Sequence, residues 1–406
     1  MRFFPEEEGR ACKAAWVPLL EYVARLHEQS IQPVVPPFRH DWAEIGPGYR
    51  CSAGLAFGHW DLIHQLFDTA PADPDHARKQ IQNYLAFQEA DGFLPGTVYV
   101  DLENASVSPT RVASHPPVWP VFVEEFCAQT GSAQLIGDTY ENLCRQIGWF
   151  ERHRAADPEG FYFLDILTRL WESGVDEGLR FDQVLPGPYA CVDASSHVYA
   201  LYDVAARWAE VLRVSSEPWR GKAERLRRWI AGNLFHERTG LFHDIFSVKT
   251  DSPPLTLEGM WPVVSGAAEP GQAQRVIEEN LLNPQRFLTR HPSSMVGMEE
   301  PGFELRMWRG PAWNSQTYWA ARGCLRYGRA DAARLLLESA LDETARVFSE
   351  TGTIWEFYHP HGGSPLDLQR KPGSSRNTPC RDYLGHNPLL AMARLWVLSK
   401  GLEPGR

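Results

Sequence analysis

Two acidic residues in loop-like segments could perform acid–base chemistry. The segment "WESGVDEGLRFD", residues 171–182, gathers four acidic side chains around two glycines and places Asp176 between Gly174 and Gly178. Because glycine tolerates tight, non-helical backbone, this spacing predicts a turn that presents Asp176 to a cavity. Arg180 follows closely enough to hold a neighbouring carboxylate or a sugar hydroxyl group.

The second candidate acid is Glu356, in the segment "TGTIWEFYHP", where it stands among Trp355, Phe357 and Tyr358. Aromatic neighbours can orient a carboxylate and exclude bulk water from it. Two carboxylates on separate loops of one cavity are what glycoside hydrolysis requires, one as the acid for the leaving oxygen and one as the base or nucleophile. The pair alone is a weak signal, because the chain has 51 acidic residues and most carboxylates lie on protein surfaces.

Helices must position these loops. Apolar residues recur with helical spacing in 17–29, in 193–212, where Asp193 is the expected N-cap, and in 330–348. There is little of the two-residue alternation that marks strands, so strands are expected to be minor. Similar helical patterns occur at about 52–70, 76–89, 117–129, 135–155, 217–232, 257–267, 271–281, 310–328 and 387–400.

About twelve helices predict an all-α fold, an (α/α)6 barrel. Six antiparallel pairs closed into a toroid leave no unprotected ends, unlike an open stack of the same length. No linker-like change of composition divides the chain, so we expect a single domain over 1–406. We expect function on the face where the long loops gather: 29–51, 91–118, 156–192, 240–256, 282–309 and 350–386.

Composition limits the classes of ligand that the protein is expected to bind. The net charge is −11 with both signs interspersed, which argues against a nucleic-acid or membrane-surface partner and favours a small ligand that is neutral or held by a few local bases. The 15 tryptophans could stack on sugar rings or fill the core. Arginine outnumbers lysine and there are 31 prolines, as in a thermophile protein or a GC-rich genome. Monomer and homo-oligomer both stay open.

Cofactors and export are not expected. The seven cysteines (Cys12, Cys51, Cys127, Cys144, Cys191, Cys324 and Cys380) are scattered without a CxxC pair, which predicts neither a disulfide framework nor a zinc site. HExxH and EF-hand spacings are absent, so we expect no metal and no cofactor. Without a long apolar run or a signal-peptide core, a cytoplasmic location is expected.

A resemblance adds to these patterns. "ESGVDEGLRFD" resembles the E-S-G-x-D-N-S-P-R-F-D signature of glycoside hydrolase family 63 and, more distantly, the S-G-W-D motif of trehalases. "WRGPAW" resembles the W-R-G-P-x-W segment of that family. The family order is kept from about residue 50 to 360, and further similar segments are "FGHWD" (57–61), "DGFLP" (91–95), "SHPP" (114–117) and "CVDASS" (191–196).

The resemblance implies an (α/α)6 barrel and an inverting mechanism, with Asp176 as general acid and Glu356 as general base. Inversion implies carboxyl groups about 6.5–9.5 Å apart, with a water between Glu356 and the anomeric carbon. Two departures fall on the leaving-group side: His115 replaces a glutamine, and residues 177–179 replace Asn-Ser-Pro. The residues that the resemblance implies for the sugar site are Trp60, Asp61, Arg180, Trp308, Arg309, Gly310 and Trp313.

Within the family, the short chain is similar to bacterial hydrolases of mannosylglycerate and glucosylglycerate, as are "IGPGY" (45–49) and "YLGHNP" (383–388). This implies an α-mannosyl- or α-glucosyl-D-glycerate substrate, a compatible solute, with mannosylglycerate favoured. An anionic substrate needs a local base near the two acids. Arg111 is favoured, because its planar fork can bind a carboxylate, although it could equally be a surface residue; further candidates are Tyr49, His115, Tyr358 and His386.

The sequence leaves other functions open. Another α-glucosidase or a trehalase-like hydrolase would share the fold. A sugar epimerase would use a histidine set, and the S-G-x-D signature argues against it. A non-catalytic helical scaffold would not need clustered tryptophans and arginines, although Trp308 and Trp313 could be core residues. The histidines of the epimerase alternative are His59, His64, His115 and His386.

Overall fold

The computed structural model describes residues 2–49, 54–182, 184–371 and 377–402, so Cys51 lies outside the described residues. Helices dominate, and some have clear local causes. Asp73 caps α4 by accepting a hydrogen bond from the backbone N–H of His76, and Pro74 occupies the first helical position. Gly131 and Gly352 end α5 and α13 in left-handed conformation. The α-helices are α1 (Glu6–Ala11), α2 (Val17–Gln29), α3 (His59–Thr69), α4 (Pro74–Leu85), α5 (Trp119–Thr130), α6 (Gln134–His153), α7 (Asp165–Thr168), α8 (Val192–Val211), α9 (Glu217–Asn233), α10 (Trp261–Ser265), α11 (Pro270–Arg275), α12 (Asn314–Arg326), α13 (Ala330–Thr351) and α14 (Leu389–Lys400).

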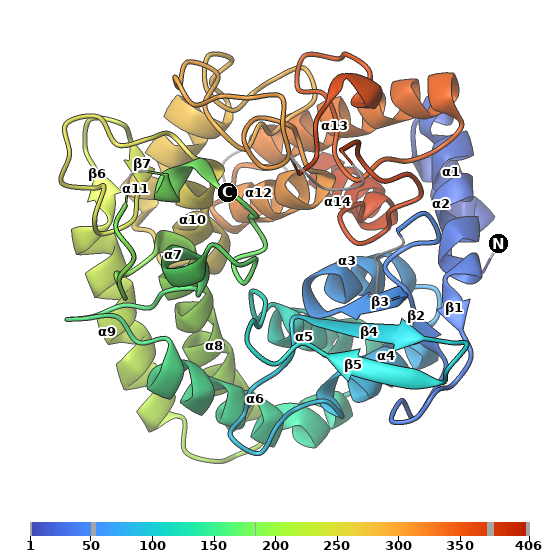
Figure 1. The fold of residues 1–406 in the computed structure, drawn as a ribbon, viewed down its shortest axis with the longest axis horizontal. Helices are drawn as coiled ribbons and strands as arrows, with labels where there is room; N and C mark the ends of the chain where they lie inside the picture. Colours follow the sequence, from blue (N-terminus) through green and yellow to red (C-terminus); the bar gives the residue numbers. More distant parts are fainter. Residues whose placement is uncertain (1, 50–53, 183, 372–376, 403–406) are drawn as a thin grey trace.

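Six helices form a closed inner ring. Each contacts the next in the order α3, α5, α8, α10, α12, α14, and α14 returns to α3. In the chain, α2 precedes α3, and α4, α6, α9, α11 and α13 each come between two successive ring helices. These six helices lie outside the ring, and Figure 1 shows the colours running round it from blue to red. The two layers differ in burial as expected, since α8 buries most of its side chains whereas α9 buries three. The predicted all-α (α/α)6 barrel is confirmed.

Strands are short and belong to the loops. β3 (Leu55–Gly58), β4 (Thr97–Asp101) and β5 (Ser106–Pro109) form an antiparallel sheet in which Gly58 pairs with Thr97. Two further pairs are β1 (Ile31–Gln32) with β2 (Trp42–Ala43), and β6 (Phe235–His236) with β7 (Leu241–Phe242). The helix expected over 52–70 therefore begins only at residue 59, because the preceding residues pair with β4.

Single-turn helices account for other differences from the expected boundaries. The pattern expected over 257–267 is divided into a 3-10 turn (Leu257–Met260) and α10, and that over 271–281 into α11 and a π-helical turn (Val276–Leu281). Asp193 is not the N-cap of α8, since Cys191 holds that position and the Asp193 carboxylate binds Arg180. The remaining 3-10 turns are Ala14–Trp16, Leu179–Phe181 and Pro365–Asp367.

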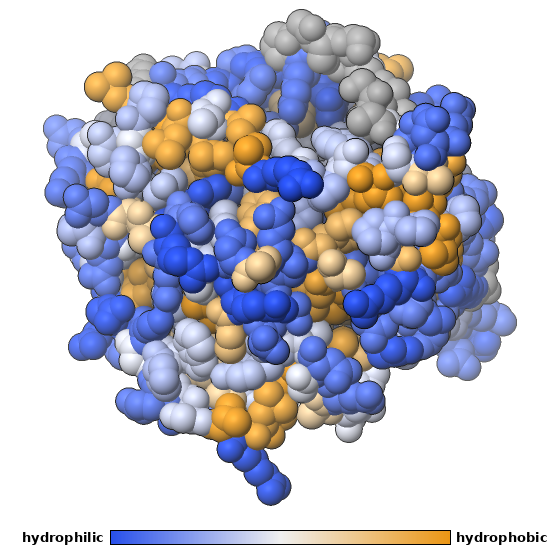
Figure 2. All heavy atoms as spheres, turned by 60° about the horizontal axis from the view of Figure 1, so that its bottom comes forward, coloured by the Kyte–Doolittle hydropathy of each residue, from blue (hydrophilic) through white to orange (hydrophobic). Residues whose placement is uncertain are grey.

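The face of the molecule drawn in Figure 2 is mixed in polarity. Figure 2 shows hydrophobic side chains in separate groups, divided by hydrophilic ones, on the face turned to the viewer. None of the helices in the described part of the chain combines the length and the apolar character that crossing a bilayer would demand.

Candidate active site

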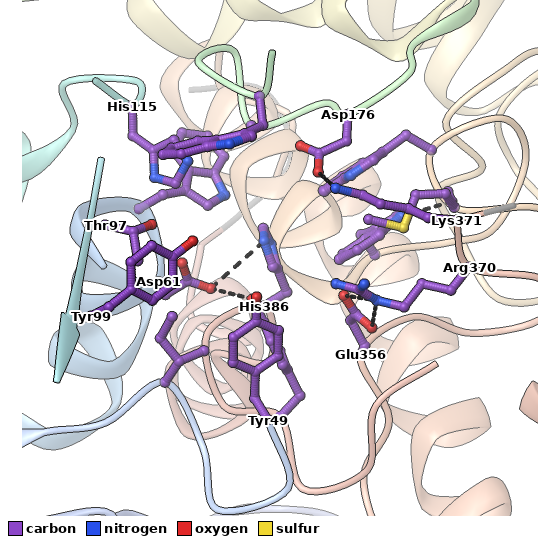
Figure 3. Close-up of a pocket in the computed structure, with 18 residues that line it drawn as sticks. Tyr49, Asp61, Thr97, Tyr99, His115, Asp176, Glu356, Arg370, Lys371 and His386 are labelled. Atoms are coloured by element: carbon purple, nitrogen blue, oxygen red, sulfur yellow. Dashed lines mark hydrogen bonds and ion pairs between the residues drawn. The ribbon is translucent and has the colours of Figure 1, made fainter. Parts of the chain in front are cut away.

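One pocket collects Asp176, Glu356 and seven more of the predicted site residues. Five of the six long loops contribute to its lining, and the loop 240–256 does not. Figure 3 shows Asp176 and Glu356 on one side of this pocket and Asp61 across from them. The predicted residues that line it are Tyr49, Trp60, Asp61, His115, Asp176, Trp308, Trp313, Glu356 and His386. The lining residues that were not predicted are Ile45, Thr97, Tyr99, Trp171, Gly174, Met307, Arg370, Lys371 and Tyr383.

Asp176 stands on the predicted turn. Gly174 has φ +74°, where a side chain would be strained, and the backbone N–H of Gly178 donates to the carbonyl of Val175 over 3.3 Å. The ammonium group of Lys371 lies 2.5 Å from Oδ2 of Asp176. The Asp176 side chain is 18% exposed, so this carboxyl group reaches the pocket while the turn fixes its position.

The other three carboxylates of the segment 171–182 bind arginines outside the pocket lining. Glu172 is buried against Arg154, with Oε2 2.7 Å from Nε. Glu177 pairs with Arg306 and Asp182 with Arg309. Three of the four acids therefore anchor the loop, and Asp176 is the one that lines the pocket.

Glu356 is almost fully buried and strongly held. Nε of Arg370 lies 3.0 and 2.8 Å from its two carboxylate oxygens, and the backbone N–H of Cys380 donates to Oε2 over 3.1 Å. Burial by itself would lower the pKa of the Arg370 guanidinium, but the charge and hydrogen bonds of Glu356 raise this pKa above its ordinary value. Arg370 therefore stays charged and gives the buried Glu356 side chain a fixed positive partner.

Asp61 lies in the first turn of α3, and its carboxylate is held by a hydrogen bond from Tyr383. Tyr383 donates its hydroxyl hydrogen to Oδ1 over 2.6 Å, and Nε2 of His386 lies 3.8 Å from the same oxygen. The hydroxyl group of Ser315 lies 2.8 Å from Nδ1 of His386. Gly385 is required here, because a Cβ on it would come within 1.9 Å of Oδ1 of Asp61.

Asp61 gives the pocket a pH-sensitive acceptor. Burial raises its pKa to about 6, although the Tyr383 hydrogen bond opposes this shift. Below that pH the carboxyl group is protonated and above it ionised, so hydrogen bonds that Asp61 accepts from a ligand should strengthen as pH rises through about 6. We predict an acidic limb near this pH in a plot of kcat/KM, which reports free-enzyme groups. Asp61→Asn should lower kcat/KM about 10- to 100-fold and displace the limb; an unchanged limb in this variant would assign it to another group.

Trp308 and Trp313 are both buried and both line the pocket. Their rings stack in parallel with centroids 3.5 Å apart, and each ring meets the ring of His386 at a steep angle. Only 2% and 1% of these side chains are exposed. The pair therefore unites the two roles weighed from the sequence, a packed core and an aromatic wall for a ligand.

His115 faces the pocket beside Trp171, with ring centroids 5.0 Å apart. Burial lowers its pKa to about 4, so the imidazole is neutral near pH 7. Its Nδ1 has no hydrogen-bond partner among the residues that the structure describes. Buried polar atoms without a partner are rare in folded proteins.

Five predicted substrate-binding residues do not line the pocket. Arg111 is exposed on the loop that follows β5. Arg180 is buried among Asp193 at 2.9 Å, Asp244 at 3.0 Å and Glu258 at 3.3 Å, so its guanidinium holds the scaffold together.

The other three also serve the scaffold. Arg309 binds the Asp182 carboxylate at 2.7 Å and the Glu177 carbonyl at 3.0 Å. A Cβ on Gly310 would come within 2.4 Å of the Glu304 carbonyl, so this glycine permits close backbone packing. The hydroxyl group of Tyr358 accepts from the backbone N–H of Trp355, and its ring stacks on His291.

The histidine set of the epimerase alternative is not assembled. His115 and His386 line the pocket, whereas His64 is buried between the Gly385 carbonyl and the Trp319 indole N–H. His59 is stacked on Tyr84, and burial lowers its pKa well below the ordinary value.

One cluster has the composition of a metal site. Atoms of Cys191, Asp193 and Asp244 lie within 4.8 Å of one another, the only such cluster in the parts of the chain that are described. The guanidinium of Arg180 donates to both carboxylates and so supplies their positive partner. We therefore assign this cluster to the scaffold.

Comparison with known proteins agrees with this fold. A family model described as the mannosylglycerate hydrolase MGH1-like glycoside hydrolase domain matches residues 58–377. The solved GH63 mannosylglycerate hydrolase of Thermus thermophilus in complex with glucose is 17% identical with a TM-score of 0.70, and the match covers 93% of this chain and 100% of that one. The same figures hold for its complex with Tris and D-glycerate. Neutral trehalase Nth1 from Saccharomyces cerevisiae is 14% identical with a TM-score of 0.65, over 94% of this chain and 82% of that one.

Proposed function

The chain belongs to the mannosylglycerate hydrolase MGH1-like glycoside hydrolase family and is a glycoside hydrolase, and from this premise we propose that it cleaves an α-glycoside of D-glycerate. The products would be a free hexose and D-glycerate, with α-mannosylglycerate favoured over α-glucosylglycerate. One observation carries the proposal: a single pocket contains Asp176, Glu356 and two adjacent bases, Arg370 and Lys371. Two acids suit hydrolysis, and the bases suit an anionic substrate.

The proposed mechanism is inverting. Asp176 gives its proton to the glycosidic oxygen as the bond between that oxygen and the anomeric carbon breaks. Glu356 takes a proton from a water whose oxygen joins the anomeric carbon from the opposite face. Exchange with solvent then returns a proton to Asp176 and removes one from Glu356.

The rest of the pocket would hold the hexose. Asp61, fixed by Tyr383 and near His386, accepts hydrogen bonds from sugar hydroxyl groups. The stacked rings of Trp308 and Trp313 offer an apolar wall for the C–H face of the sugar. These groups favour a pyranose over a linear ligand, because a compact ring with an apolar C–H face and outward hydroxyl groups fits between an aromatic wall and a set of acceptors.

A trehalase-like activity is the second candidate, favoured by the shared fold. Trehalose has a neutral leaving sugar, so it would bring no anion to Arg370 and Lys371. The test is to incubate the protein with α-mannosylglycerate, α-glucosylglycerate and trehalose and to identify the released sugars. We expect hexose from a glycerate glycoside and little from trehalose; release from trehalose alone would reject the proposal.

A further inference from the structure

A second cavity lies toward the end of the barrel opposite the active site. Trp60 and Asp61 of the active-site pocket stand at the N-terminus of the inner helix α3. Arg207 and Arg326, which line the second cavity, stand near the C-termini of α8 and α12. The inner helices α5, α8, α10 and α12 line this cavity, together with the two residues before α5. Its volume is about 430 Å³, a size typical of small-molecule sites.

The buried part of this cavity is apolar. Trp261 and Trp319 line it, with ring centroids 5.8 Å apart. Walls of this kind suit a flat or branched apolar body and offer few hydrogen bonds to a sugar. The buried aliphatic residues that join the two tryptophans are Val118, Val204 and Val264.

A buried histidine adds a polar atom to these walls. His197 lines the cavity and is 4% exposed, and its ring centroid lies 4.2 Å from that of Trp261. Its Nε2 has no hydrogen-bond partner among the residues that the structure describes. Burial lowers the pKa of His197 to about 4, so the imidazole is neutral near pH 7. His197 therefore adds no charge to the buried part of the cavity.

Charged side chains lie at the mouth, and two of the three arginines there are already paired. Nε of Arg207 lies 2.7 Å from Oε1 of Glu124, and the same guanidinium binds Asp203. Nη2 of Arg322 lies 2.7 Å from Oε2 of Glu125. The two acids that line the cavity, Glu124 and Asp203, thus already have a positive partner.

The third arginine, Arg326, is different. It is the last residue of α12, it is exposed, and none of the described residues offers it a carboxylate or a hydrogen-bond acceptor. A Cβ on Gly266 would come within 3.1 Å of Nη1 of Arg326, so the guanidinium lies across the end of α10. Its planar set of donors is therefore open to an anion at the mouth of the cavity.

We propose that this cavity is a second binding site, for a small carboxylate with an aromatic or aliphatic body. The body packs against Trp261 and Trp319, and the carboxylate binds the guanidinium of Arg326. A cation is disfavoured, because Glu124 and Asp203 are already paired with Arg207. The site uses neither acid of the active-site pocket, so it does not depend on the proposed function.

Calorimetric titration of the intact protein with phenylacetate and with phenylacetamide tests this proposal. The two probes share a benzyl body, and only phenylacetate is an anion. We expect phenylacetate to bind about 10- to 100-fold more tightly, because hydrogen bonds to a charged group are the stronger ones. Arg326→Met keeps a long apolar side chain and removes the charge, so it should weaken phenylacetate binding to the level of the amide. Equal binding of the two probes by the wild type, or no binding of phenylacetate, would overturn the proposal.

Two further positions establish where the probe binds. Ala200 of α8 lines the cavity, so Ala200→Phe should fill the space and abolish binding, whereas Ala200→Ser should bind as the wild type does. Lys371→Met removes a base from the active-site pocket and should leave phenylacetate binding unchanged. Loss of binding in Lys371→Met, with full binding in Arg326→Met, would place the probe in the active site and reject the second site. Thermal melts check that each variant is folded.

Discussion

Asp176→Asn is expected to lower kcat on an α-glycosylglycerate by about 10²–10⁴, because it removes the proton donor for the leaving oxygen. The amide is nearly the same size as the carboxyl group, and the turn is fixed by Gly174 and by backbone hydrogen bonds. The fold should therefore be kept, with a thermal midpoint within a few degrees of the wild type. Initial rates of hexose release, together with a thermal melt, measure both quantities.

The leaving group separates a lost acid from a damaged site. An α-glycosyl fluoride expels fluoride, which needs little protonation, so Asp176→Asn should lose much less activity on the fluoride than on the glycerate glycoside. Glu177→Gln is the matched control, since Glu177 is the next residue but pairs with Arg306 outside the pocket lining. Near-normal kcat in Asp176→Asn on the natural glycoside would remove Asp176 from the mechanism.

Glu356→Gln is expected to lower kcat by about 10²–10⁴ on the glycerate glycoside and on the glycosyl fluoride alike. Both substrates need a water to be deprotonated at the anomeric carbon, and glutamine cannot take that proton. The glutamine carbonyl oxygen can still accept from Arg370, which limits the structural cost of losing the charge. Steady-state kinetics on the two substrates test this split.

The same two substrates would also reveal whether the acid and base roles of Asp176 and Glu356 are assigned the wrong way round. If Glu356→Gln kept its activity on the fluoride and lost it on the glycerate glycoside, Glu356 would be acting as the acid. The roles of Asp176 and Glu356 would then have to be exchanged.

Much of the barrel could be predicted from local signals. Helical spacing of apolar residues identified the helices, and their number indicated six closed pairs. Predicted helix boundaries were wrong where a segment pairs with residues distant in sequence. Residues 55–58 form the strand β3 because residues 97–100 pair with them. The helical spacing of apolar residues within 52–70 carries no information about such a distant strand.

In the site too, local features could be predicted and tertiary contacts could not. The place of Asp176 on a turn could be predicted because Gly174 and Gly178 flank it closely in the sequence, and Trp308 and Trp313 could be placed together because they share one short motif. Arg180 was placed in the pocket because arginine suits sugar hydroxyls as well as carboxylates. The folded chain surrounds it with Asp193, Asp244 and Glu258, and only the tertiary fold brings these acids together.

The sequence-based prediction missed both basic residues that line the pocket, Arg370 and Lys371. An anionic substrate requires a local positive charge, and Arg111 was the prediction because its planar fork can bind a carboxylate. Arg370 and Lys371 were overlooked, since a basic pair in a long polar loop resembles an ordinary solvated surface. A usable signal was present: these bases are in the same predicted loop as Glu356, which is the one predicted to need water excluded.

The stereochemistry of the first product tests the proposed roles of Asp176 and Glu356 most directly. Proton NMR at early times, before mutarotation, follows the anomeric signal of hexose released from an α-glycosylglycerate. If Asp176 is the acid and Glu356 activates water on the opposite face, the β-anomer appears first. Initial appearance of the α-anomer would mean a retaining reaction and would contradict the proposed role of Glu356.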